Sequence, residues 1–268
     1  MANSRSGESV LQRAMRILES FHPDHPRLTA AQVAAATGLS RSTTHRLVTE
    51  MTSVGMLQRL PDGSVTVSDH SWETSVRCSP LEQLRDLARP VLEDLHARFD
   101  HHLFLAVPDF GELSVLYLEH YDAQYPLRIV SRHASRLPIH DNSAGLTMLA
   151  FAGTASVGRV LDGPLSDRVT GEPVDPARIR AELRRIRHQG YGHIVGGMVT
   201  ENTSFAVPCF TLTDRSVQCA LGLVARTDRC DHDEVLAALM AAGRQLSAAL
   251  TAAQAAPRSP GLSRSTGR

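Results

Sequence analysis

The chain has 268 residues, with 28 basic and 28 acidic side chains and a formal net charge of +0 at pH 7. This length is sufficient for two domains with separate hydrophobic cores. The neutral total excludes nucleic-acid binding by excess positive charge alone, so a DNA-binding surface must depend on where individual arginines lie. The sequence has no N-terminal apolar run of signal-peptide type and no apolar stretch near 20 residues. We therefore expect a cytoplasmic protein with no membrane partner.

The first predicted helix begins after Ser9, which forms a capping box with Gln12. Its apolar residues recur every three to four positions, as in a helix that buries one face. Leu11 and Ala14 could instead face a second copy of the chain. The apolar stripe consists of Val10, Ala14, Ile17, Leu18 and Phe21.

The segment from Leu28 to Gly55 predicts two short helices separated by a tight turn. Thr29 caps the first helix, and Gly38 ends it because glycine tolerates the left-handed conformation. Ser40 caps the second helix, which in such an arrangement enters the DNA major groove. The inward positions of this second helix are predicted to be Leu47, Val48, Met51 and Val54.

The exposed first turns of this second helix carry hydroxyl and guanidinium groups, which suit base edges and phosphates. Met56 to Ser68 then reads as a β-hairpin with its turn at Pro61-Asp62-Gly63, which is typical of a wing. The alternative is an ordinary helical hairpin with a solvated face. Serine and threonine are mediocre helix formers, and together with the hairpin they favour DNA binding. The predicted DNA-contacting residues are Ser40, Arg41, Ser42, Thr43, His45, Arg46 and Arg59.

A clear helix start, Ser79-Pro80-Leu81-Glu82, opens a predicted linker helix that runs to about Phe99. Pro90 lies inside it and should kink it. Beyond it, short apolar runs alternate with helical patterns, as in an α+β domain. The predicted strands are Leu103 to Val107, Leu113 to His120, Leu127 to Ser131, Phe205 to Thr211 and Val217 to Ala225, and the helices are Asn142 to Gly153, Asp175 to Gln189 and one capped by Asp231.

Four motifs, in this order, resemble the IclR family of bacterial transcriptional regulators. TAAQVAAATGLSRSTTHRLVTEMTSVGML is similar to the family's helix-turn-helix. RLPIHDNSAGLTMLAF, RRIRHQGYG and SFAVPCF are similar to three signatures of its effector-binding domain. Two places depart from the family pattern. Gly145-Leu146-Thr147 stands where relatives often have Gly-Lys-Ala, and Val65 to Ser68 replaces a Tyr-Arg-Leu-Gly-like run.

The elements and the resemblance together predict an N-terminal all-α winged helix-turn-helix plus a C-terminal α+β sensor domain, joined by a linker helix. The resemblance implies that the sensor domain is GAF-like. The predicted boundaries are 9–70 for the DNA-binding domain, 71–100 for the linker helix, 101–254 for the effector-binding domain and 255–268 for a disordered tail.

Small residues after Asn142 suggest a ligand site at a helix N-terminus. Ser143, Ala144 and Gly145 would let a carboxylate approach free backbone N–H groups. The alternative is a close helix–sheet contact that needs small residues. All basic residues are arginines, and Arg128 and Arg132 could contribute to binding. The resemblance places the effector between this helix and the sheet, and implies the lining residues Leu127, Ile129, Ser143, Ala144, Gly145, Ser204, Phe205, Gly222 and Val224.

These features predict a transcriptional regulator, a repressor, whose affinity for a double-stranded DNA operator is modulated by a small organic acid. It should act as a homodimer or dimer of dimers, through the first helix and the linker helix around Leu84 and Leu95. We expect no enzyme activity, cofactor or metal, because no GxSxG elbow, paired carboxylates or zinc-ligand spacing occurs. The alternatives are an enzyme that turns over its ligand, and a DNA-binding protein whose sensor domain serves only for oligomerisation.

Overall fold

The computed structural model describes residues 7–255. These residues fall into two compact units, which divide between Glu82 and Gln83, inside the segment predicted as the linker. Residues 256–268 of the predicted disordered tail lie outside the described residues, and Ala255 ends a helix.

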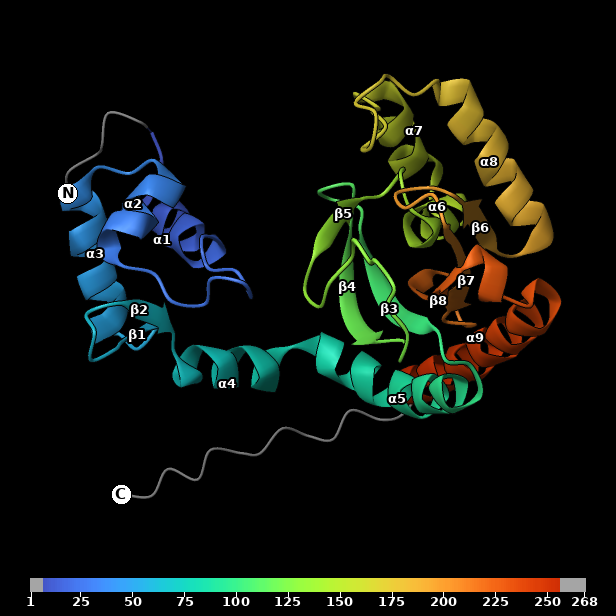
Figure 1. The fold of residues 1–268 in the computed structure, drawn as a ribbon, viewed down its shortest axis with the longest axis horizontal. Coiled ribbons are helices and arrows are strands. Elements are labelled where there is room, and N and C mark those ends of the chain that lie inside the picture. The colour runs from blue at the N-terminus through green and yellow to red at the C-terminus, as the bar shows by residue number, and fades with distance from the viewer. Residues whose placement is uncertain (1–6, 256–268) are drawn as a thin grey trace. The chain divides into compact units, whose positions relative to one another are not determined.

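The first unit is a helix-turn-helix followed by a hairpin (Figure 1). Its caps agree with the sequence analysis because they depend on neighbouring residues only. Ser9 and Thr29 both form complete capping boxes, and Gly38 ends its helix with a left-handed φ of 69°. The elements are α1 (Val10–Glu19), α2 (Ala30–Thr37), α3 (Arg41–Ser53), β1 (Leu57–Arg59), β2 (Val65–Val67) and α4 (Asp69–Cys78).

The core of the first unit agrees with the sequence prediction at Ala14 and differs from it at Val10, which is 47% exposed, and at Val54. Ala14 is buried in the core, so it is not available to a second copy of the chain. Val54 is 64% exposed, so its prediction as an inward residue is wrong. The reason is that α3 ends at Ser53, and Val54 is the C-cap residue rather than part of the helical face. The core residues are Ala14, Ile17, Leu28, Val33, Leu47, Val48, Met51, Leu57 and Val65.

The predicted wing is present as the antiparallel pair β1–β2. Leu28, between α1 and α2, extends this small sheet through two backbone hydrogen bonds with Val65, of 2.8 and 3.0 Å. The hairpin is therefore tied to the helix-turn-helix by backbone pairing as well as by the buried side chains of Leu57 and Val65.

The segment predicted as one linker helix contains two helices. α4 ends at Cys78, Ser79 adopts an extended conformation, and α5 (Pro80–Arg98) follows. α5 continues through Pro90. The sequence analysis did not predict α4.

The second unit is an α+β domain around one antiparallel sheet, and the predicted fold class is confirmed. The strand order is β5-β4-β3-β8-β7-β6. α6 packs on one face of the sheet with α7 and α8 outside it, and α9 packs on the other face (Figure 1). The strands are β3 (His102–Asp109), β4 (Ser114–Tyr121), β5 (Arg136–Pro138), β6 (Gly192–Val195), β7 (Asn202–Phe210) and β8 (Val217–Arg226), and the helices are α6 (Ser143–Ala150), α7 (Thr154–Asp162), α8 (Pro176–Gln189) and α9 (His232–Ala255), with a short 3-10 turn at Thr227–Arg229.

Leu127 to Ser131 forms no strand, so that prediction is wrong. The third strand of the meander is β5, which occupies the edge of β4 in its place. The segment between β4 and β5 instead runs outside the sheet, where Asn202 Nδ2 donates to the Arg128 carbonyl at 3.0 Å. Its residues line the cavities described below instead of pairing in the sheet. The sequence analysis also did not predict α7 and β6.

One helix corrects the expectation that the chain has no apolar stretch near 20 residues. α9 has 24 residues and is long and apolar enough, by length and composition, to cross a membrane. Its residues Val235, Leu239 and Leu246 are buried in the domain, and the helix packs on β7 and β8. α9 is thus the core helix of a packed domain.

We predict that Gly145→Ala destabilises the protein by about 1–3 kcal/mol, because an added Cβ would lie 2.2 Å from the Ile139 carbonyl oxygen. Thermal or urea denaturation measures the change. The matched control is Gly158→Ala in α7, where a Cβ meets nothing within 4 Å. That substitution should stabilise the protein by about 0.5–1 kcal/mol through helix propensity. Equal effects of the two substitutions would contradict the close contact at Gly145.

Candidate functional site

The first candidate site is the exposed face of α3. Arg41, Ser42, His45 and Arg46 are all exposed, whereas Thr44 between them is buried against the unit's own core. The four exposed side chains follow from the helical period, which turns the apolar positions inward and leaves these outward. The result is a polar surface on the helix that follows the turn of the helix-turn-helix.

Two of the predicted DNA-contacting residues serve the start of α3. Ser40 Oγ accepts from the Thr43 backbone N–H at 3.2 Å, and its hydroxyl also donates to Thr43 Oγ1 at 2.9 Å. These bonds satisfy part of the helix N-terminus. Ser40 and Thr43 therefore stabilise the first turn of α3, next to the exposed side chains of Arg41 and Ser42.

The arginines of this unit differ in their partners. Arg46 forms an ion pair with Glu50, 2.7 Å apart and one turn later on α3. Arg59 on the wing donates to the Gly63 carbonyl across its own hairpin at 3.2 Å. Both side chains are exposed, so solvent screens these interactions and either guanidinium can exchange its partner for a phosphate.

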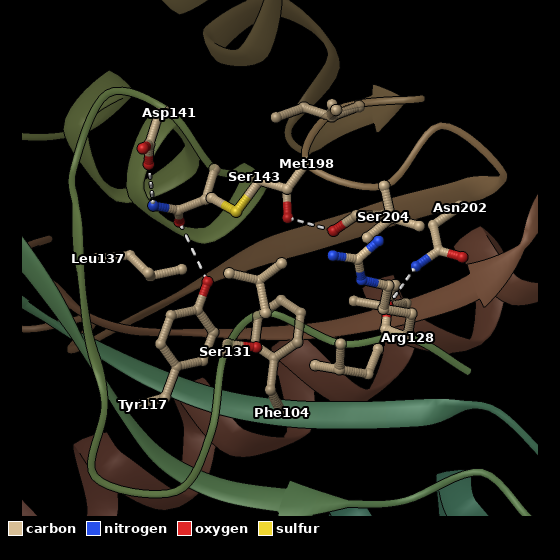
Figure 2. Close-up of a pocket in the computed structure, with 17 residues that line it drawn as sticks. Phe104, Tyr117, Arg128, Ser131, Leu137, Asp141, Ser143, Met198, Asn202 and Ser204 are labelled. Carbon is tan, nitrogen blue, oxygen red and sulfur yellow. Dashed lines mark hydrogen bonds between the residues drawn. The ribbon is translucent and has the colours of Figure 1, made fainter. Parts of the chain in front are cut away.

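The second candidate site is a pocket of about 80 Å³ in the second unit. It lies between the sheet, the N-terminus of α6 and the segments that follow β4 and β6 (Figure 2). Its walls are mainly apolar, with polar groups at the start of α6 and on β7. The lining residues are Phe104, Tyr117, Arg128, Ile129, Val130, Ser131, Leu137, Asp141, Asn142, Ser143, Ile194, Gly197, Met198, Val199, Asn202, Ser204 and Val224.

Four of the nine residues predicted to line an effector site are in this wall: Ile129, Ser143, Ser204 and Val224. The hydroxyls of Ser143 and Ser204 lie 2.6 Å apart, so they link α6 to β7 at the pocket (Figure 2). Ser143 and Ser204, which are 61 positions apart in the sequence, were both predicted to line one site, and they lie together in this pocket.

Three residues predicted to line the effector site do not line the pocket, because α6 and β8 pack them elsewhere. Ala144 is fully buried in the core. The N–H of Gly145 donates to Asn142 Oδ1 at 2.7 Å, and the residue rests on the Ile139 backbone. The ring of Phe104 covers Gly222. Gly145 is thus packed against the Ile139 backbone in the turn before α6. None of the three residues lines the pocket.

Two further predicted residues face elsewhere. Side chains alternate along a strand, so Phe205 points to the opposite face from Ser204, where its ring stacks on His193 with centroids 4.1 Å apart. Leu127 lines a separate cavity of about 590 Å³, together with His102 and His120. Neither residue lines the pocket of Figure 2.

The polar groups of the pocket form one network beside α6. Asn142 caps this helix, and the Tyr117 hydroxyl lies 3.3 Å from its Oδ1 (Figure 2). Asp141 accepts from Asn142 Nδ2 at 3.1 Å through Oδ1, while its Oδ2 is buried without a hydrogen-bond partner. Burial raises the pKa of Asp141 above its ordinary value. A partly desolvated carboxyl group therefore lies at this end of the pocket.

The positive charge of the pocket comes from Arg128, the one cationic residue among those described in its lining. Within residues 7–255 its guanidinium has no ion-pair or hydrogen-bond partner. In the view of Figure 2, Arg128 and Tyr117 lie on opposite sides of the pocket. The pocket thus has a cationic end and an end with a hydroxyl and a carboxyl group.

The sequence analysis did not include Tyr117, Asp141 and Asn202 in the pocket. The signal for Tyr117 is its place in the alternating pattern of β4, but the face of that strand can be assigned only once its pairing with β3 is known. Asn142, rather than Asp141, is the N-cap residue of α6. Within the described residues, no group of three or more His, Cys, Asp or Glu side chains could hold a metal ion.

Comparison with known proteins identifies the two units. The model of the IclR helix-turn-helix domain matches residues 10–61, and that of the bacterial transcriptional regulator IclR C-terminal region matches residues 81–248. Among solved structures, an IclR homolog from Microbacterium hydrocarbonoxydans in complex with 4-hydroxybenzoate is 33% identical, with a TM-score of 0.82 and coverage of 91% of this chain and 100% of that chain.

Sequence relatives give the same result. The probable transcriptional regulator SauR of Cupriavidus necator is 27% identical over 232 residues, which cover 82% of this chain and 86% of SauR. The transcriptional repressor IclR of Escherichia coli is 23% identical over 183 residues, 68% of this chain and 67% of that protein. The chain therefore belongs to the IclR family of bacterial transcriptional regulators, with a DNA-binding helix-turn-helix followed by the family's C-terminal domain.

Proposed function

We propose that the protein is a repressor that binds its operator through α3 and the wing, and that a small carboxylate in the pocket of the second unit lowers this affinity. Two observations carry the proposal: one unit has an exposed polar helix face, and the other has a pocket whose arginine has no ion-pair or hydrogen-bond partner for its guanidinium among residues 7–255. Relatives named as repressors, and the 4-hydroxybenzoate complex of a relative, support both halves.

The pocket favours a short carboxylate with an aromatic or aliphatic body. Arg128 offers a guanidinium fork for the carboxylate, and Phe104, Ile129 and Val130 offer apolar walls. The carboxylate is assigned to Arg128 rather than to the first turn of α6, because Asn142 already occupies the Gly145 N–H and the Asp141 carboxyl group lies beside Asn142. The cavity is smaller than the roughly 150 Å³ that holds benzene in an engineered core. An aromatic ligand therefore requires the flexible side chains of Arg128 and Met198 to move.

The experiment that tests this function is footprinting of the DNA upstream of the protein's own gene and its neighbours, repeated with candidate carboxylates. A protected pseudo-palindromic site that is released by one carboxylate supports the proposal. Protection that no carboxylate changes would leave the second unit with a role in oligomerisation only, and conversion of the carboxylate to a product would identify an enzyme.

For DNA binding, we predict that Arg46→Ala weakens binding to all duplexes alike and lowers the slope of log affinity against log salt by about one unit, because one phosphate contact is lost. Fluorescence anisotropy over a salt series measures this slope. The control is Arg226→Ala, which removes an exposed arginine with a 2.8 Å ion pair to Asp228 in the second unit. A slope that falls equally in both variants would argue against a phosphate contact by Arg46.

For assembly, we propose a homodimer formed through α1, with a dimer of dimers as the larger alternative. One winged helix covers too little DNA for specific binding, and a second copy doubles the contact. α1 exposes Val10, Leu11 and Met15, and Leu11 is 77% exposed. Leu84 and Leu95, predicted as helping contacts, are buried within the chain and are unavailable.

We predict that Leu11→Glu shifts the protein towards the monomer in sedimentation at micromolar concentration and weakens operator binding, because a carboxylate cannot be buried at an apolar interface without a partner. Leu212→Glu is the control, since it changes an equally apolar exposed residue of the second unit. A dimer that persists in the Leu11→Glu variant would place the interface elsewhere.

For the effector, we predict that Arg128→Ala abolishes stabilisation by the carboxylate and leaves operator binding unchanged. At 100 times its dissociation constant a ligand adds about 2.7 kcal/mol of stability, which a thermal melt detects. Arg132→Ala is the control, because Arg132 lies four residues away but lines the separate cavity with His102. Stabilisation retained in a folded Arg128→Ala protein would show that the carboxylate binds elsewhere.

A further inference from the structure

The orientation of the Asn142 side-chain amide is fixed by partners that cannot exchange roles. Its Oδ1 accepts from the Gly145 backbone N–H at 2.7 Å, and a backbone N–H can only donate. Its Nδ2 donates to the Pro138 carbonyl at 2.6 Å and to Asp141 Oδ1 at 3.1 Å. Turning the amide over would place two donors together at Gly145 and two acceptors together at Pro138. Both Asn142 amide hydrogens are therefore used away from the pocket.

This orientation determines the role of the Tyr117 hydroxyl. Tyr117 Oη lies 3.3 Å from Asn142 Oδ1, and because Oδ1 can only accept, Tyr117 must donate its single proton there. Tyr117 is 3% exposed, and burial raises its pKa further above the ordinary value, so the hydroxyl keeps this proton. Towards a ligand in the pocket, the Tyr117 hydroxyl can therefore only accept a hydrogen bond, through an oxygen lone pair.

We infer that Tyr117 selects effectors that carry a hydrogen-bond donor at the end opposite their carboxylate. The inference rests on the proposed function, in which the carboxylate binds Arg128. A hydroxyl or amino group can donate to Tyr117 Oη, whereas a carboxylate or carbonyl oxygen at this place would face a lone pair.

The walls between the two ends define the class of ligand more closely. The rings of Phe104 and Tyr117 meet edge to face, with centroids 5.4 Å apart. Such aromatic surfaces favour a further ring in the same pocket. The selected class is therefore a single-ring aromatic carboxylate with a hydroxyl or amino group across the ring from the carboxylate.

The test is a titration of the full chain, by calorimetry, with four ligands of similar size: benzoate, 4-fluorobenzoate, 4-hydroxybenzoate and 4-aminobenzoate. We expect the two donor ligands to bind about tenfold more tightly than benzoate, as for one hydrogen bond, and 4-fluorobenzoate to bind like benzoate. In Tyr117→Phe the advantage of the two donor ligands over benzoate should be lost, so that all four ligands bind with similar affinity. Tyr121→Phe is the control, because Tyr121 lies on the same strand but does not line the pocket.

Each outcome has a distinct meaning. Equal affinities of the four ligands for the unsubstituted protein overturn the selection by Tyr117 and leave the carboxylate pocket intact. A donor preference that survives in Tyr117→Phe overturns the assignment to this residue. Binding of none of the four overturns the effector class of the proposed function, and the inference with it. The unsubstituted protein tests the polarity of the pocket without any variant, so the result does not depend on whether Tyr117→Phe folds.

Discussion

The close contact of α6 with the sheet is the constraint on which the second unit depends. All residues of α6 are buried, from Ser143 to Ala150, and none carries a charge. On the sheet, Gly192 of β6 lies directly against Thr147 and the Ser143 carbonyl of α6, while Gly145 lies directly against the Ile139 carbonyl in the turn that follows β5. Because every residue of α6 is buried in the domain, the pocket lies at its N-terminal end, where the chain turns in from β5.

The same contact brings the pocket groups together. Asn142 satisfies the first turn of α6 with its side chain and at the same time holds Tyr117 from β4. Ser143 reaches Ser204 on β7. Residues from three separated parts of the chain thus meet at the pocket, where the roles of Asn142 and Tyr117 as donor or acceptor are set. A binding site whose polar groups are already oriented loses less entropy when a ligand binds.

Features that depend on neighbouring residues could be predicted from the sequence, and features that depend on pairing between distant segments could not. The caps at Ser9, Thr29 and Ser40 were predicted because cap and partner lie within three residues. Ser204 and Phe205 were both predicted to line the pocket, but successive residues of a strand face opposite sides of the sheet, so only Ser204 does. Leu127 to Ser131 has the composition of a strand, but β5 occupies the available edge of β4. Which face a strand residue occupies, and which segment pairs with β4, depends on the pairing of strands that are distant in the sequence.

Much of the pocket wall comes from the segment between β4 and β5, which forms no strand and contributes Arg128, Ile129, Val130 and Ser131. Its backbone is anchored by Asn202 through a carbonyl group, so the anchor does not depend on which side chain position 128 carries. Substitutions in this segment change the shape and charge of the pocket without disturbing the buried faces of the sheet. Divergence of ligand preference among descendants of this protein is therefore separable from folding stability, and a library of variants confined to these four positions can redirect the sensor towards new small molecules while the domain around it stays folded.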